Sequence, residues 1–271
     1  MRGARFDAVA LLPLIAFVGA FLALPLARLI AVAGSGPSGA AAYFAVLTDA
    51  GYRATLIDTL AVAAATTFLT LLFGTIAAQF LAGRRFPGRD ALVAAMVLPL
   101  AFPGVVVGFM VILLGGRLGL IGRASEFVSG DKIVFAYSLT GLLVGYLYFS
   151  LPRVLVTIMA AMERLDPSLV EAARSLGAGP FALQRDVVLP ALAPALAASG
   201  ALCFATAMGA FGTAFTLATR IDVLAMTIYT EFTLSANIAM AAALSLALGL
   251  VTWLALALAR RLAGGVAMTA A

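Results

Sequence analysis

The sequence predicts an all-α, polytopic membrane protein with six transmembrane helices and one long polar loop between the fourth and the fifth. Two observations predict this class. The chain of 271 residues is 64% hydrophobic and only 11% charged, and its mean hydropathy is +1.13. Soluble domains carry roughly 25% charged residues. The expected solvent of this chain is therefore a lipid bilayer.

Six apolar windows are long enough to cross a bilayer, since a spanning helix needs roughly 20 mostly apolar residues. They are residues 8–33, 54–82, 91–114, 133–160, 191–219 and 238–259. Backbone groups in hydrocarbon must bond internally, which leaves helices or closed barrels. Continuous apolar runs lack the alternation of a barrel. We expect residues 1–271 to form a single transmembrane domain, with the first window retained because it is too long for a cleaved signal.

Two of the windows contain residues that interrupt helices. Residues 98–104 read LPLAFPG, in which two prolines remove backbone donors, and residues 208–213 read MGAFGT, with two glycines around an aromatic residue. Broken helices at membrane depth are tolerated where they line a cavity or are buried in protein. We expect the third to fifth windows to line a translocation route, although packing is the alternative role for each residue. The candidate gate or contact residues are Phe102, Tyr146, Met208 and Phe211.

Charged side chains are nearly absent from the middle of the windows. Asp58, Arg28 and Arg153 each lie near a window end, where a long side chain can reach the interface. An ion-coupled carrier places charges within its helices and shows internal repeats, so a secondary carrier is the less favoured alternative. Ten Lys and Arg residues lie near the window ends on one side of the membrane and six lie on the other side. By the positive-inside rule, the side with ten, which holds both termini and the 163–190 loop, is expected to be cytoplasmic.

Several function classes are excluded by residues that the chain lacks. It has no histidine and one cysteine, Cys203, which removes His-dependent catalysis, disulfides and the usual transition-metal sites. A nucleotide-binding P-loop needs Lys before Ser or Thr, but the single lysine, Lys132, precedes Ile133. We expect no metal, cofactor or catalytic residue in this chain. The net charge of +5 is interpreted as a topology signal rather than as nucleic-acid binding.

The loop at 163–190 is long, amphipathic and marked at both ends. Asp166 and Pro167 are suited to cap and start a helix, and Gly177 is suited to end it in a left-handed conformation. A second short helix is expected from Pro180 towards Val188. The first helix carries one apolar stripe at helical spacing, formed by Leu169, Ala172, Ala173 and Leu176. The residues alone leave two interpretations open, namely a docking hairpin and a helix lying on lipid head groups.

The same loop resembles the signature of permeases in binding-protein-dependent ATP-binding cassette (ABC) importers, Glu-Ala-Ala-x3-Gly-x9-Ile-x-Leu-Pro. The spacing agrees at every position, and Val187 replaces Ile. The resemblance covers most of the chain from the second window onward. It implies the type I importer fold, in which this loop forms coupling helices that dock on a cytoplasmic ATPase. The implied docking residues are Glu171, Ala172, Ala173, Arg174, Gly177, Leu189 and Pro190.

The resemblance also implies partners and a location. The partners would be two ATPase subunits that carry ATP and Mg²⁺, a second permease chain (a sister or a second copy), a soluble substrate-binding protein and the lipid bilayer. The binding protein would dock on outer loops at residues 34–53, 115–132 and 220–236. The location would be the bacterial cytoplasmic (inner) membrane. The interrupted windows look most like those of polyamine, opine, phosphonate and ferric-iron permeases, so a polyamine-like or aminoalkylphosphonate-like solute is expected. Ferric iron, sulfate, molybdate and thiamine are the alternatives.

Overall fold

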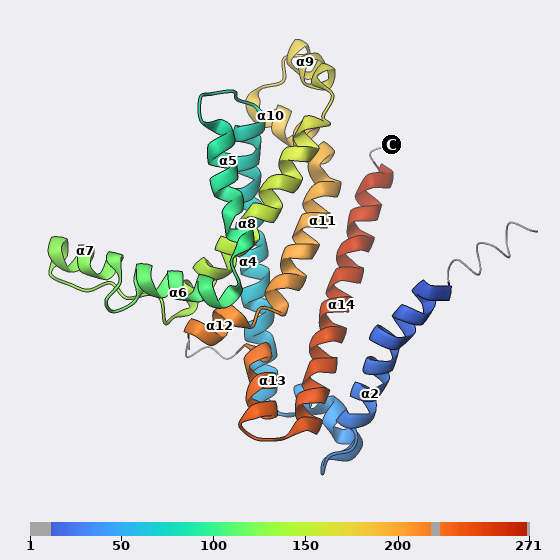
Figure 1. Cartoon of the computed structure of the whole chain (residues 1–271). Coiled ribbons are helices and arrows are strands. Elements are labelled where there is room, and N and C mark those ends of the chain that lie inside the picture. The colour runs from blue at the N-terminus through green and yellow to red at the C-terminus, as the bar shows by residue number, and fades with distance from the viewer. Residues whose placement is uncertain (1–11, 218–222, 270–271) are drawn as a thin grey trace, which may run out of the picture.

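The computed structural model describes residues 12–217 and 223–269 (Figure 1). Helices joined by loops make up this described part, which contains no strand. The start of the first predicted window, residues 8–11, lies outside the described residues. So do residues 218–222, which include the end of the fifth window and the start of the predicted outer loop at 220–236.

Three long helices form the centre of the molecule. They are α4 (Ala50–Ala82), α8 (Leu139–Glu163) and α11 (Leu189–Met208), and each packs against the other two. Helix α14 (Ile238–Thr269) packs beside α11. The first span, Leu12–Ala33, ends in α2 (Leu24–Ala33), leans away from the bundle and contacts it through α14 (Figure 1). The best 18-residue window of this span has no buried residue, so it adds little to the core.

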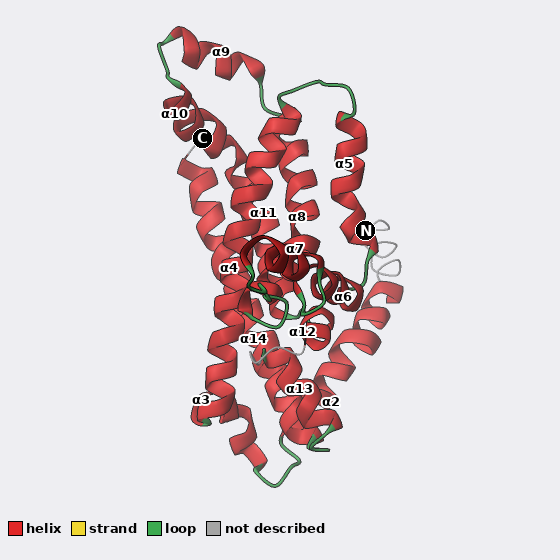
Figure 2. Ribbon diagram, turned by 90° about the vertical axis from the view of Figure 1, so that its left-hand side faces the viewer, coloured by secondary structure: helices red, strands yellow, loops and turns green. Residues whose placement is uncertain are grey.

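Short helices fill the connections between the long ones (Figures 1 and 2). Helix α5 (Arg89–Val97) lies beside α8. Helices α6 (Gly104–Gly115) and α12 (Gly212–Leu217) contact each other and α8, and each follows a break in one of the predicted windows. The shorter helices are α3 (Ala45–Thr48), α5 (Arg89–Val97), α6 (Gly104–Gly115), α7 (Leu120–Ser129), α9 (Pro167–Ser175), α10 (Pro180–Leu183), α12 (Gly212–Leu217) and α13 (Leu224–Thr233).

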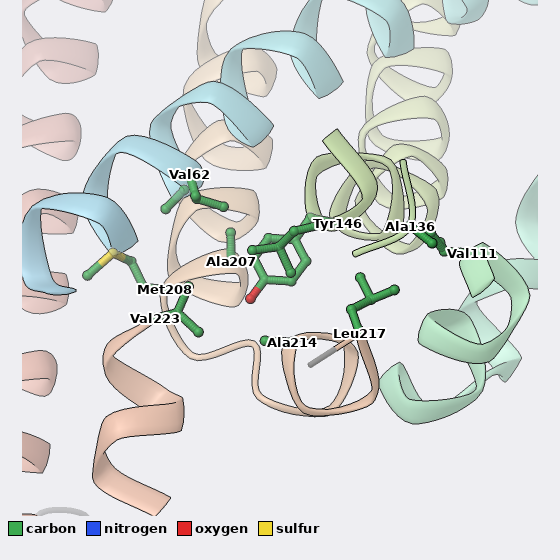
Figure 3. Close-up of a cluster of buried hydrophobic side chains, with 11 residues drawn as sticks. Val62, Val111, Ala136, Tyr146, Ala207, Met208, Ala214, Leu217 and Val223 are labelled. Atoms are coloured by element: carbon green, nitrogen blue, oxygen red, sulfur yellow. The ribbon is translucent and has the colours of Figure 1, made fainter. Parts of the chain in front are cut away.

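The bundle is held together by two hydrophobic clusters on α4, α8 and α11. The cluster nearer the 163–190 loop contains Leu81, Leu155, Ile158 and Leu192, each at most 2% exposed. The second cluster surrounds Tyr146 in the middle of the molecule (Figure 3). Lipid tails are as apolar as these side chains, so close packing rather than water exclusion favours the association.

Six helical segments of the described residues have the length and hydropathy of membrane spans, which confirms the predicted all-α, six-helix class. The third window differs from its prediction. Residues 91–114 do not form one straight helix but are divided into α5, a 3₁₀ turn at Leu98–Ala101 and α6. The physical reason is the pair Pro99 and Pro103, which lack backbone donors. The candidate third span runs instead from Gly104 to Ser129.

Two further boundaries also differ from the predicted windows. The fourth helix begins at Leu139 rather than at 133, because the backbone N–H groups of Phe135 and Ala136 both bond to the Gly115 carbonyl, at 2.9 and 3.0 Å. The fifth helix ends at Met208, and α12 then runs in another direction (Figure 1).

The predicted outer loops contain helices that the sequence did not predict. Helix α13 lies within 220–236 and is attached to α4, because the Thr59 hydroxyl accepts a 2.8 Å hydrogen bond from the Leu224 N–H. The segments at 34–49 and α13 lie at the end of the bundle opposite the 163–190 loop, whereas α7 projects from the side at middle height (Figures 1 and 2). The three loops therefore do not gather on one face of this chain.

Candidate functional site

The 163–190 segment forms a helical hairpin at one end of the bundle (Figure 1). Its first helix, α9, begins at Pro167, and the Asp166 carboxylate accepts a 2.9 Å hydrogen bond from the Ser168 backbone N–H. This hydrogen bond lowers the pKa of Asp166 below its usual range. The cap satisfies one of the free N–H groups that every helix start exposes. The helix start that the sequence predicts at Asp166–Pro167 is confirmed.

The turn of the hairpin depends on Gly177, whose φ is +84°. The N–H of Ala178 bonds to the Ala173 carbonyl at 3.0 Å, and the N–H of Gly177 bonds to the Arg174 carbonyl at 2.9 Å. Glycine occupies this left-handed conformation without the steric cost that a Cβ adds. The chain then enters α10 and a π-helical turn at Gln184–Val188, which continues into α11. The predicted second helix is thus present.

The hairpin presents apolar side chains that the rest of the chain does not cover. Leu176 is 89% exposed, Phe181 is 78% exposed and Leu169 is 53% exposed. Among the residues predicted to dock on an ATPase, all except the half-buried Ala173 are exposed. The exposed ones are Glu171, Ala172, Arg174, Gly177, Leu189 and Pro190. This surface is accessible to a partner, and its docking role stays a prediction.

The base of the hairpin is joined to the bundle. The Gln184 side chain donates a 2.9 Å hydrogen bond to the Gln79 side-chain oxygen of α4. Val188 is 5% exposed and packs in the cluster that contains Leu192 of α11. A force on the hairpin would therefore reach α4 and α11 directly.

A second candidate region lies where two spans are interrupted. We call the segments 98–104 and 209–212 the paired breaks. At Phe102 and Pro103 the backbone is extended before α6 begins at Gly104, and at Gly209 α11 ends before α12 begins at Gly212.

The paired breaks are joined by hydrogen bonds and close packing. The Thr213 hydroxyl donates to the Gly104 carbonyl at 2.9 Å, and the Thr216 hydroxyl lies 3.2 Å from the Val105 carbonyl. A Cβ on Gly145 of α8 would lie 2.6 Å from the Thr213 methyl group. Small residues thus allow three elements to meet at one point.

Tyr146 supports the second break from inside the bundle. Its hydroxyl donates a 2.7 Å hydrogen bond to the Ala210 carbonyl, and Figure 3 shows the ring extending from α8 towards the segment between α11 and α12. The side chain is 1% exposed. A buried backbone carbonyl without a partner is costly in a membrane, so this bond stabilises the interrupted conformation.

A pocket of about 270 Å³ lies between the paired breaks and α8, and we call it the break pocket. Among the described residues of its lining, Arg153 alone has an ionisable side chain. The guanidinium donates a 3.2 Å hydrogen bond to the Thr206 hydroxyl. The lining residues are Pro99, Leu100, Phe102, Gly104, Phe149, Arg153, Thr206, Gly209, Ala210, Gly212 and Thr213.

Arg153 was missed as a site residue because the sequence placed it near the inner end of its window. In the structure it lies ten residues before the end of α8 at Glu163, which is about 15 Å along a helix. Its guanidinium bonds to Thr206 within the protein. The signal that could have identified it was an arginine inside an apolar window, which is rare and usually functional.

The four predicted pathway residues occupy different environments. Phe102 lines the break pocket. Tyr146 and Met208 are each 1% exposed in the central hydrophobic cluster, and Phe211 packs against the rings of Phe215 and Tyr229. Their roles on a pathway stay predictions. The side chains of Tyr146 and Met208 are positioned for packing.

Comparison with known proteins assigns the family. Residues 70–267 match the sequence profile described as "Binding-protein-dependent transport system inner membrane component". The chain belongs to this family. This binding-protein-dependent permease is a transport subunit of an ABC importer and a multi-pass inner membrane protein, and ATP hydrolysis is the task of a separate subunit. The ABC importer permease that the sequence predicted is thus confirmed.

The relatives of this binding-protein-dependent permease include molybdenum and sulfate transport system permease proteins. It is 34% identical over 176 residues to the "Molybdenum transport system permease protein ModB" of Escherichia coli (strain K12), covering 65% of this chain and 76% of the relative. It is 35% identical over 205 residues to the "Sulfate transport system permease protein CysT" of Salmonella typhimurium (strain LT2), covering 76% of this chain and 72% of the relative. These names match the alternative substrate class rather than the polyamine-like one.

Solved structures agree on the fold. A chain of a bacterial ABC transporter involved in the import of the acidic polysaccharide alginate superposes with a TM-score of 0.79 at 17% identity, covering 97% of this chain and 96% of that one. A chain of the MetNI methionine ABC transporter superposes with a TM-score of 0.59 at 18% identity, covering 77% of this chain and 93% of that one. The type I importer permease fold is therefore shared.

Proposed function

We propose that this permease imports a tetrahedral oxyanion of the sulfate and molybdate class, driven by ATPase subunits that dock on the 163–190 hairpin. The observation that carries the proposal is the similarity to sulfate and molybdenum permeases at 34–35% identity over 65–76% of the chain. The polyamine-like substrate expected from the sequence has no such support among these relatives.

The charges near the paired breaks also support an anion. A polyamine carries several positive charges, which would need carboxylates along its route, whereas anion pores use Arg or Lys. The break pocket contains Arg153 and, among its described lining residues, no carboxylate. Asp58 lines a different, mostly apolar pocket on α4 beside Leu139 and Leu143. An anion is thus the solute that the break pocket favours.

The proposed drive is a rigid-body movement of the hairpin. Leu176 and Phe181 offer apolar area to a groove on an ATPase, and the Gln184–Gln79 hydrogen bond and Val188 connect the hairpin to α4 and α11. Closure of two ATPases would move the hairpins and change the accessibility of the pathway. This proposal includes a second permease chain, a substrate-binding protein and a cytoplasmic location for the hairpin and both termini.

Uptake by the reconstituted complex tests the substrate class. The permease is co-expressed with an ATPase subunit, a second permease chain and a substrate-binding protein from its source genome, and the complex is placed in liposomes that contain ATP. Radiolabelled sulfate, molybdate and spermidine are offered in turn. We expect ATP-dependent uptake of sulfate or molybdate and none of spermidine. Uptake of spermidine without either anion would overturn the proposed substrate class.

A further inference from the structure

We propose that Arg153 and the break pocket form an oxyanion-binding station within the membrane, so that the permease itself selects for negative charge. The inference rests on the proposed function, because it names where an imported oxyanion would be held inside this chain. It assigns to Arg153 a role as a specificity-determining residue.

The first support is the position of the charge. An arginine in the middle of an apolar helix is expensive to keep away from water, and such residues mark substrate and ion pathways. Arg153 lies within α8, is half-buried, and forms no ion pair with any described residue. Its charge is therefore not neutralised by a carboxylate of the described chain and is available to an anion.

The second support is the hydrogen bonding of the guanidinium. The Thr206 hydroxyl donates to the Leu202 carbonyl at 2.7 Å and accepts from Arg153 at 3.2 Å. Thr206 thus has no further proton to donate, and it acts as a positioning residue for Arg153. A guanidinium has five N–H donors, so most of them stay available after this bond. Their planar fork fits the oxygen atoms of an oxyanion.

The third support is the space and polarity around Arg153. The break pocket holds about 270 Å³, far more than the ~15 Å³ that one water molecule requires. Helices α6 and α12 begin at Gly104 and Gly212 in this lining, and α11 ends beside it at Met208. Among the described lining residues, Arg153 alone has a charged side chain.

Charge-removing variants of the full complex give the first test. In Arg153→Gln we expect the uptake of sulfate and molybdate to fall about tenfold or more, whereas Arg153→Lys retains a larger share because it keeps the charge. Thr206→Val is expected to raise KM, with rescue by Thr206→Ser. The matched control is Arg28→Gln, which removes an exposed arginine from the first span and should leave uptake unchanged. Uptake by Arg153→Gln within twofold of the wild type would overturn the inference.

Chemical labelling separates a charged site from a folding defect. A cysteine replaces Ala210 in the pocket lining after the single native cysteine is removed by Cys203→Ala. Anionic and cationic methanethiosulfonates are compared, with each rate normalised to that at an exposed Ser38→Cys. We expect the anionic reagent to be favoured about tenfold, molybdate to slow its reaction, and Arg153→Gln to abolish both effects.

The labelling outcomes also separate this inference from the proposed function. Equal normalised rates for the two reagents, or no protection by molybdate, would contradict an oxyanion station even if the wild-type complex imports sulfate. If the wild-type complex imports neither anion, the proposed substrate class fails, and with it the role given to Arg153.

Discussion

Leu176 on the hairpin is 89% exposed, whereas Thr213 between the paired breaks is 1% exposed. Both regions interrupt an apolar chain, but they are stabilised in different ways. The hairpin depends on local devices, namely the Asp166 cap and the left-handed Gly177. The paired breaks depend on bonds between residues far apart, such as Thr213 to Gly104. An exposed hairpin can be stabilised by residues close together in the sequence, while an interrupted membrane helix needs its neighbours.

The largest expected effect comes from replacing Gly177. Its φ of +84° costs an L-residue about 1–2 kcal/mol, and a bulky side chain would also stand on the proposed docking surface. We expect Gly177→Leu to abolish uptake and to uncouple ATP hydrolysis from it, and Gly177→Ala to do so in part. The ratio of solute uptake to ATP hydrolysis by the reconstituted complex measures this coupling.

The matched control for Gly177 is Gly179→Ala. Gly179 has a φ of −69° and, like Gly177, open space around its Cβ direction, so alanine should be tolerated there. Full transport and complex assembly by Gly177→Leu would contradict the docking hypothesis.

Gly145→Ala should have the next largest effect, this time on the paired breaks. The new Cβ would lie 2.6 Å from the Thr213 methyl group, and Thr213 cannot rotate without losing its bond to Gly104. Overpacking of this kind costs about 1–3 kcal/mol. We expect a lower denaturation midpoint in detergent. The control is Gly249→Ala on α14, where the new Cβ would meet open space, so this variant should be neutral or stabilising. Equal denaturation midpoints for the two variants would refute the close approach of Gly145 to Thr213.

Thr213→Val tests the hydrogen bond between the breaks. The Gly104 carbonyl would lose its 2.9 Å side-chain donor, and a typical hydrogen bond contributes about 0.5–1.5 kcal/mol. Thr252→Val is the control, since that hydroxyl bonds to Leu248 within α14 and its loss should change stability less. Thermal denaturation of both variants measures the difference. If Thr213→Val and Thr252→Val lower the denaturation midpoint equally, the hydrogen bond between the breaks contributes no more to stability than the bond within α14.

The smallest effect is expected from Asp166, through pH. Its hydrogen bond to Ser168 lowers the pKa of the folded state, so the cap stabilises α9 above the usual Asp pKa. That contribution is lost as the pH falls through the lowered folded value. The protection of the α9 amides against hydrogen exchange, taken relative to the intrinsic exchange rate at each pH, should therefore fall in acid for the wild type but not for Asp166→Asn, which caps without titrating. Parallel pH profiles for the two proteins would exclude this role of the carboxylate.

Much of the hairpin could be predicted from the sequence because its signals are local. Asp166, Pro167 and Gly177 set the backbone conformation of residues within about one helical turn in the sequence. The structure contains the cap and the turn that they indicate. The site at the paired breaks was predicted only in part. The prolines and glycines located the interruptions, but Phe102 alone of the four pathway candidates lines the break pocket. Burial of Tyr146 and Met208 depends on the packing of α8 and α11.

The sequence by itself determined that this chain resides in a membrane, where its helices are interrupted, and which loop resembles an ATPase-docking hairpin. These properties follow from composition and from residues close together in the chain. Only the tertiary structure decided that residues 109 positions apart meet at Thr213 and Gly104 and that Arg153 reaches Thr206. The physical reason is that an apolar window shows where a helix crosses the bilayer, whereas its rotation and neighbours are set by packing.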